Sequence, residues 1–235
     1  MLRAMHYSPL VNHLNEAPVS EESSDEDEKE CETCWSTGAN ESSSNSDLSA
    51  ENTCRPPGIS NEDSCEPILS EESKVLLGEQ IKQISMHFPP RLTACTWTME
   101  YSTMKHGTSL RTLYRSMHGL DCSTFIVIKD TDGQVFGAFC SSPLRVSDCF
   151  YGTGETFLFS FSPELQVFKW TSKNSFFVKG NLDSFAFGGG RGIFGLWLDG
   201  DLYHGRSLTC DTFNNDILSK TEDFFVHVLE VWALK

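Results

Sequence analysis

The chain has 235 residues and carries 33 acidic against 18 basic side chains, a formal charge of −15. This charge argues against non-specific nucleic-acid binding, and the longest strongly apolar run, Phe125–Ile128, is far shorter than the ~20 residues of a transmembrane helix. The first residues lack the apolar core of a secretory signal, and nine cysteines without regular spacing fit free thiols in a reducing compartment. We therefore expect an intracellular protein that does not insert into membranes.

The acidic residues are concentrated in the first third of the chain. Residues 1–73 hold 17 acids and 3 bases, whereas residues 74–235 hold 16 acids and 15 bases. Of 27 aromatic residues, only Tyr7 and Trp35 precede Phe88. A segment this charged, with so little to bury, cannot offset the entropy of ordering its backbone. Residues 1–70 are predicted to be a disordered acidic tail rich in serine and glutamate, followed by one domain over residues 74–235.

The tail carries two motifs with alternative interpretations. Ser23 and Ser24 precede a run of acids, which makes them candidates for phosphorylation by an acid-directed kinase, whereas the plainer interpretation is a solvated tether. Cysteines in the tail could form a zinc or redox site, but they lack the second close pair of a structural zinc site. We therefore expect no metal and interpret them as incidental thiols; they are Cys31, Cys34, Cys54 and Cys65.

Two helices are expected in the domain. Leu77, Ile81, Ile84 and Phe88 recur at helical spacing, with capping side chains in Ser70–Ser73 before them and two prolines after them. The second helix is marked by apolar positions at i, i+3, i+4 and i+7, with Thr108 or Ser109 as its cap and Gly119 at its end; these positions are Leu110, Leu113, Tyr114 and Met117.

The rest of the domain is predicted to form short strands at roughly ten-residue spacing, a pattern typical of a β-sandwich or β-barrel. Residues 130–133 predict a hairpin turn between two strands, and Asp199-Gly200 a tight turn between two others. Strands and helices do not alternate along the sequence as they would in a parallel sheet. The fold class is predicted to be α+β, an antiparallel two-sheet β-sandwich with flanking helices. The expected strands are 97–101, 124–129, 134–140, 157–161, 167–170, 176–178, 184–187, 193–198, 201–203 and 226–234.

Three loops contain candidate functional residues. Gly152 and Gly154 could bring backbone amides to a phosphate, but no helix follows them, so a tight turn is the better interpretation, with Glu155 bonded to turn amides or exposed for a partner. Arg191 interrupts a glycine run that is either a bulged, flexible connection or a contact loop. His204 and Ser207 could form a hydrolytic set with Glu155 or Asp201, although no nucleophile elbow is present and His204 is better interpreted as capping a strand end.

Cys210 is the strongest candidate for a redox thiol, because Arg206 lies near it in the sequence, although the acidic Asp211 is also close. The domain otherwise offers no convincing acid/base pair, metal cluster or phosphate cradle. No cofactor is expected, and binding is favoured over catalysis.

Taken together, these segments resemble the TLDc domain of the oxidation-resistance family. The resemblance covers about residues 74–235 in order and suggests a short, single-domain member. It is carried by Phe88–Arg91, Tyr101–Leu110, Leu113–Arg115, Gly133–Ala138, Tyr151–Phe159, Val167–Trp170, Phe194–Asp199, Asp201–Ser207, Thr212–Asn215 and Leu229–Trp232.

The resemblance implies a β-sandwich with peripheral helices, a role in resistance to oxidative stress without an agreed enzymatic activity, and binding to the peripheral sector of the vacuolar-type proton-pumping ATPase. We further expect a monomer located in the cytoplasm and the nucleus, which associates with endolysosomal membranes through the pump. The alternatives are a thiol- or histidine-dependent enzyme, antioxidant or hydrolytic, and a nuclear adaptor. We hypothesise an interaction surface made of positions that match the most distinctive motifs of the family, together with the arginine in the glycine-rich loop. Its residues are Gly152, Gly154, Glu155, Arg191, His204, Gly205, Arg206 and Ser207.

Overall fold

The computed structural model describes residues 67–235. Most of the predicted tail, including Ser23, Ser24 and its four cysteines, lies outside the described residues. Short helices lie near the start of the described part, and strands form the rest. The helices are α1 (Gly78–Ser85), the 3-10 helix η1 (Pro90–Leu92), α2 (Thr103–His106) and α3 (Leu110–Met117). Among residues 67–235, no helix has both the length and the apolar character needed to cross a membrane.

Eleven strands pair into a continuous antiparallel arrangement, apart from one parallel pair at its start. Along the main path the order is β6-β5-β4-β3-β11-β10-β9-β8-β7, and β2 joins β1 to β11 beside this path. The strands are β1 (Ile68–Leu69), β2 (Thr96–Ser102), β3 (Ser123–Asp130), β4 (Val135–Cys140), β5 (Phe157–Phe161), β6 (Leu165–Phe168), β7 (Val178–Gly180), β8 (Ser184–Phe187), β9 (Leu196–Asp199), β10 (His204–Arg206) and β11 (Asp223–Leu234).

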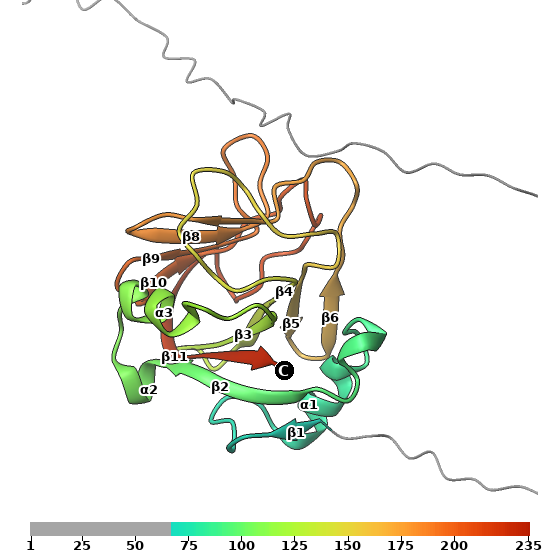
Figure 1. Cartoon of the computed structure of the whole chain (residues 1–235). Helices are drawn as coiled ribbons and strands as arrows, with labels where there is room; N and C mark the ends of the chain where they lie inside the picture. Colours follow the sequence, from blue (N-terminus) through green and yellow to red (C-terminus); the bar gives the residue numbers. More distant parts are fainter. Residues whose placement is uncertain (1–66) are drawn as a thin grey trace, which may run out of the picture. The chain divides into compact units, whose positions relative to one another are not determined.

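The long strand β11 belongs to both sheets of the sandwich. Its first residues, Asp223–Phe225, pair with β10, and its remainder pairs with β3 and β2. The register shifts between Val226 and Val228, where the strand passes from one sheet to the other. The first sheet therefore contains β6 to β3, most of β11, β2 and β1, and the second contains the start of β11 and β10 to β7 (Figure 1). This confirms the predicted two-sheet antiparallel sandwich with flanking helices.

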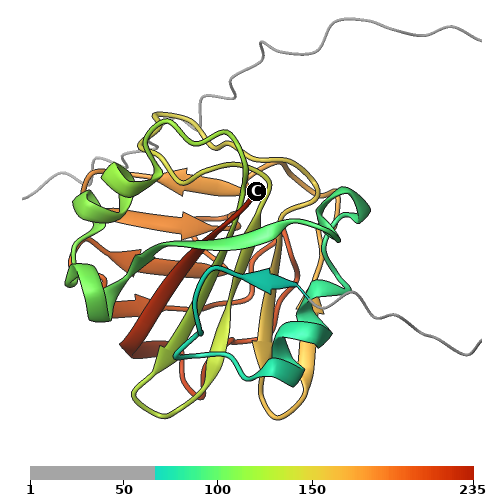
Figure 2. The same ribbon diagram turned by 60° about the horizontal axis from the view of Figure 1, so that its bottom comes forward.

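The first sheet is buried on both faces, because alternate residues of its strands enter two different cores. In β3, Ile126 and Ile128 belong to the core between the sheets, whereas Phe125 and Val127 belong to a second core on the outer face. The N-terminal segment of residues 67–92, which we call the strap, crosses that outer face (Figure 2). Its buried side chains include Val75, Leu76, Ile84, Phe88 and Leu92.

A buried carboxylate fastens the strap to β11. Glu230 is fully buried, and its side chain accepts hydrogen bonds from Ser73 Oγ and Lys74 N, both at 2.7 Å, and from Trp232 Nε1 at 3.3 Å. The Ser73 hydroxyl also accepts bonds from the amides of the next two apolar residues of the strap. Ser73 was expected to help cap α1, but it binds Glu230 instead, and α1 starts five residues later.

Several boundaries differ from the predictions. The predicted strand 201–203 is wrong: these residues form a turn, and the strand begins at His204. The strands expected at 167–170 and 176–178 lie at 165–168 and 178–180. β1 and residues 70–73 also precede the predicted domain start at 74, because Ile68 and Leu69 pair with β2. The two predicted helices are found, and the second, β5 and β8 have the bounds expected.

Candidate functional site

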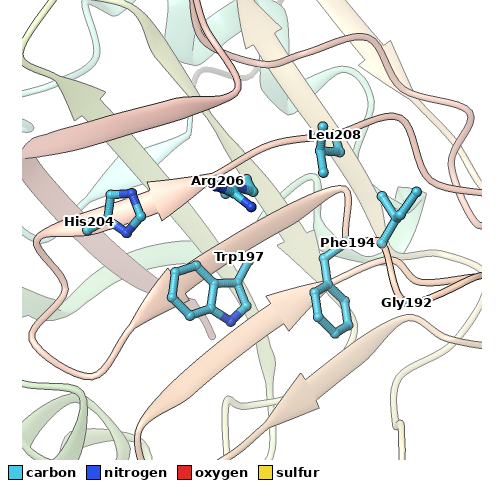
Figure 3. A pocket seen from close by; sticks show the side chains of 7 residues that line it. Gly192, Phe194, Trp197, His204, Arg206 and Leu208 are labelled. Atoms are coloured by element: carbon cyan, nitrogen blue, oxygen red, sulfur yellow. The ribbon is translucent and has the colours of Figure 1, made fainter. Parts of the chain in front are cut away.

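The outer face of the second sheet carries a pocket of about 370 Å³. The alternation of the strands places its side chains there: Leu196 and Leu198 of β9 enter the core, so Trp197 faces outward. His204 and Arg206 face outward from β10 in the same way. Figure 3 shows these side chains around the pocket, which is lined by Gly192, Ile193, Phe194, Trp197, His204, Arg206 and Leu208.

Gly205 sets the local packing between the two polar residues of β10. A Cβ atom at this position would lie 2.3 Å from Cζ of Phe224, so only glycine lets that ring pack directly under β10. The turn before β10 is held by the carboxylate of Asp199, which accepts bonds from the amides of Tyr203 at 3.0 Å and His204 at 3.2 Å. The positions of His204 and Arg206 are therefore set by the packing at Gly205 and by the turn that leads into the strand.

An aromatic row extends from the pocket across the sheet. The ring centroids of Trp197 and His204 lie 6.0 Å apart, those of His204 and Phe225 5.7 Å, and those of Phe225 and Tyr203 5.2 Å. Tyr203 and Phe225 are 55% and 47% exposed. Large side chains exposed together in this way are typical of interaction sites. We call the pocket and these aromatic residues together the aromatic face.

Charges on the aromatic face are paired. Arg206 donates from Nε to Asp223 Oδ1 at 2.8 Å and from Nη2 to Oδ2 at 3.0 Å, and His204 Nε2 lies 3.3 Å from Oδ1. The hydrogen bonds from Arg206 hold the pKa of Asp223 below its usual value. Because the guanidinium is already occupied by this carboxylate, the pocket presents apolar surface with a neutralised polar rim.

Ser207 lies beside the aromatic face in sequence but points into the protein. Its hydroxyl is fully buried, donates to the carbonyl of Gly195 at 2.8 Å and accepts from the amide of Leu218 at 3.0 Å. The imidazole of His204 pairs with Asp223, and Glu155 has a different partner. The hydrolytic arrangement considered from the sequence is therefore not assembled.

The loop before β5 forms a separate feature. Gly152 has φ +104°, and a Cβ on Gly154 would lie 2.4 Å from the ring of Trp170, so both glycines are required by the turn and its packing. The Glu155 carboxylate forms a two-pronged ion pair with Arg91 of η1, and these hydrogen bonds lower the pKa of Glu155. Glu155 thus connects the loop to the strap, which neither sequence-based alternative anticipated.

Arg191 and Cys210 belong to two packed loops. Arg191 adopts φ +56° and donates to Asp211 at 3.2 and 2.8 Å, while its side chain remains 81% exposed. Cys210 is only 2% exposed, and its thiol donates to Asn215 Oδ1 at 3.2 Å. Burial raises the pKa of the Cys210 thiol, the opposite of what a reactive thiolate requires.

The structure therefore gathers only some of the predicted residues. His204 and Arg206 line the pocket, Arg191 adjoins it in sequence through Gly192, and Gly205 supports it from below. Residues that the sequence argument missed make up most of the aromatic face: Phe194, Trp197, Tyr203, Leu208, Asp223 and Phe225. Strand alternation offered a signal for Trp197, since its neighbours are leucines. Among residues 67–235, no group of three metal-ligating side chains is close enough to hold an ion.

Comparison with known proteins supplies the family. The TLDc domain matches residues 69–235, well over half of the chain. The chain belongs to the TLDc family. It is 61% identical over 173 residues to "Oxidation resistance protein 1" from Homo sapiens and 60% identical over 173 residues to the Xenopus tropicalis protein. It is 54% identical over 167 residues to "Nuclear receptor coactivator 7" from Homo sapiens.

These alignments cover unequal shares of the proteins. They include 74% of this chain for the two oxidation resistance proteins and 71% for the coactivator, but only 20%, 20% and 18% of those relatives. The chain thus spans about a fifth of the length of these relatives.

Proposed function

We propose that the chain is a non-enzymatic interaction module that binds the peripheral sector of the vacuolar-type proton-pumping ATPase, regulates the pump and contributes to resistance to oxidative stress. The family supports the stress-resistance role through relatives named as oxidation resistance proteins. The pump follows from what TLDc resemblance implies. It would bring the chain to the cytoplasmic surface of endolysosomal membranes, with cytoplasm and nucleus as its wider locations.

The aromatic face is the observation that carries the binding function. Trp, Tyr and Arg dominate the energetic centres of protein interfaces, and this face presents Trp197, Tyr203 and Arg206 together with a pocket. A partner that inserts an apolar side chain between Phe194 and Trp197 would remove both from water without separating the Arg206–Asp223 pair. Such a contact needs no reacting group, which agrees with a binding role.

The geometry of the candidate residues disfavours the alternative, a thiol- or histidine-dependent enzyme. Cys210 is buried with its pKa raised, and the Ser207 hydroxyl is used in the protein interior. An enzyme of this kind should turn over hydrogen peroxide or an activated ester and lose that turnover in Cys210→Ser or His204→Ala. Measurable turnover abolished by either change would favour the enzyme over the binding module.

The direct test mixes the full 235-residue chain with purified pump peripheral sector and measures co-sedimentation, ATPase rate and subunit assembly. We expect saturable binding together with a changed rate or assembly state. If no complex forms at micromolar concentrations of both components, the pump proposal fails. Binding without any change in rate or assembly would remove the regulatory part of it.

A further inference from the structure

The two strands at the ends of the main strand order, β7 and β6, differ in what covers their outer edges. β7 is covered on its outer side by residues 147–151: Tyr151 exchanges backbone hydrogen bonds with Val178, and the Ser147 amide donates to Gly180 O at 2.9 Å. β6 ends the opposite side of the strand order. Within residues 67–235, the backbone of Leu165–Phe168 pairs with β5 and with no other segment. The outward N–H and C=O groups of β6 are therefore available for another strand.

A groove opens beside the start of this free edge. It is an open groove of about 580 Å³ between the flank of α1 and the β5–β6 hairpin. In Figure 1, α1 lies next to the lower end of β6. Gln80 and Gln83 line the helix side with amide groups, and Phe161 and Leu165 line the hairpin side. Met86, 72% exposed, adds a flexible apolar side chain to the helix wall.

The two ends of β6 carry opposite charges. Glu164 lies at the hairpin end, whereas exposed Lys169 directly follows β6 at the other end. Among the described residues, Lys169 takes part in no ion pair. Burial lowers the pKa of His87 in the groove wall, and the nearby charge of Lys169 adds a smaller effect in the same direction. An acidic group would be attracted to the Lys169 end and repelled from the Glu164 end.

We propose that the β6 edge and this groove bind an extended peptide segment of a partner protein, which adds a strand to the first sheet. The segment places an apolar side chain against Met86, Phe161 and Leu165 and an acidic side chain near Lys169. This site lies on the first sheet and is independent of the pump and of the aromatic face.

The chemistry of the walls explains this choice of ligand. Added strands gain affinity from main-chain hydrogen bonds and specificity from pockets that take alternate side chains. β6 supplies the main-chain groups on one side, and the amides of Gln80 and Gln83 can bond to polar groups of the peptide on the other. At ~3.3 Å per residue, the four residues of β6 accommodate a segment of about four to five residues. A helix would leave the outward backbone groups of β6 unpaired.

The probe is a phage-displayed library of random twelve-residue peptides, panned on the full chain. We expect enriched peptides that share an apolar residue and an acidic residue on an extended pattern. Synthetic copies should bind with micromolar Kd, and hydrogen exchange should slow at the amides of residues 165–168. Met86→Glu should weaken binding at least about tenfold. Met104→Glu is the matched control, since Met104 is 67% exposed on α2 and should leave Kd unchanged.

Three outcomes would overturn the proposal. The first is that no peptide is enriched over uncoated surface. The second is that enriched peptides bind Met86→Glu as tightly as the unchanged chain and lose affinity in Trp197→Ala, which would place them on the aromatic face. The third is that bound peptides leave exchange at residues 165–168 unaltered. A double variant, Gln80→Ala with Gln83→Ala, checks the effect without introducing charge, and circular dichroism verifies that each variant is folded.

Discussion

Replacement of Glu230 tests how the strap is held on the first sheet. In Glu230→Ala, the Ser73 hydroxyl and the Lys74 amide lose an acceptor at 2.7 Å, and Trp232 Nε1 loses one at 3.3 Å. Two further backbone amides donate to the Ser73 hydroxyl, so Ser73 also holds the bend that leads into the buried part of the strap. The change should therefore loosen α1 and η1 as well as lower global stability.

The expected loss follows from the hydrogen bonds. Each bond to a charged group contributes roughly 1.5–3 kcal/mol, so the two short bonds contribute about 3–6 kcal/mol before other effects. Removing a buried carboxylate also removes its desolvation cost, which offsets part of the stability lost with these hydrogen bonds. We expect a net decrease of about 2–3 kcal/mol in the free energy of unfolding, which for a domain of this size lowers Tm by about 5–10 °C.

Urea unfolding followed by circular dichroism measures the global effect, and hydrogen exchange over residues 67–92 measures the strap. Glu230→Gln keeps one acceptor oxygen and should lose less than the alanine variant. Glu222→Ala removes an exposed carboxylate just before β11 and should change stability by no more than ~0.5 kcal/mol. If Glu230→Ala is as stable as Glu222→Ala, or if its strap exchanges no faster than in the unchanged chain, the hydrogen bonds of Glu230 do not hold the strap.

Three further predictions concern packing, titration and thiol reactivity. A Cβ on Gly137 would lie 2.0 Å from the backbone oxygen of Ile126, so Gly137→Ala should lower the free energy of unfolding, measured in urea, by about 3 kcal/mol or more. A Cβ on Gly78 would meet nothing within 4 Å, so Gly78→Ala should be tolerated and raise the free energy of unfolding by up to ~1 kcal/mol. Equal effects at the two glycines would contradict this packing. Because Arg206 lowers the folded pKa of Asp223, the pair stabilises the fold above the unfolded value of ~3.9 and loses that contribution as pH falls through the lower folded pKa. NMR titration should show a midpoint below ~3.9 that returns toward it in Arg206→Gln; an unchanged midpoint would refute the pairing in solution. Alkylation with iodoacetamide, mapped by mass spectrometry, should leave Cys210 unmodified until the protein unfolds, and rapid native labelling there would revive the redox interpretation.

Local sequence signals located the elements with strong periodicity. The predicted second helix has the bounds of α3, because its apolar stripe is regular and Ser109 accepts a bond from the Thr112 amide. The prediction of a strand at 201–203 was wrong for a specific reason. Leu202 is fully buried although it lies in a turn with φ +50°, so an apolar residue between polar neighbours imitated the alternation of a strand.

Long-range pairing limited the prediction of the site. Nothing local in residues 223–234 shows that β11 changes sheets near Val226, yet this crossing places Asp223 and Phe225 beside β10. The aromatic face combines residues from β9, β10, β11 and the loops next to them, so the sequence alone could identify His204 and Arg206 but not their neighbours. The role of Glu230 was likewise hidden, because its partners in the strap lie more than 150 residues earlier.

The most direct test of the proposed function compares the affinity of the pump peripheral sector for the full chain and for Trp197→Ala. Biolayer interferometry with the immobilised chain gives Kd for each. We predict that Trp197→Ala raises Kd by at least about tenfold, as expected for the centre of an interface. Leu182→Ala, which removes a 67% exposed side chain from the turn between β7 and β8, should leave Kd unchanged. Equal affinity of the Trp197→Ala variant and the unchanged chain would contradict the account.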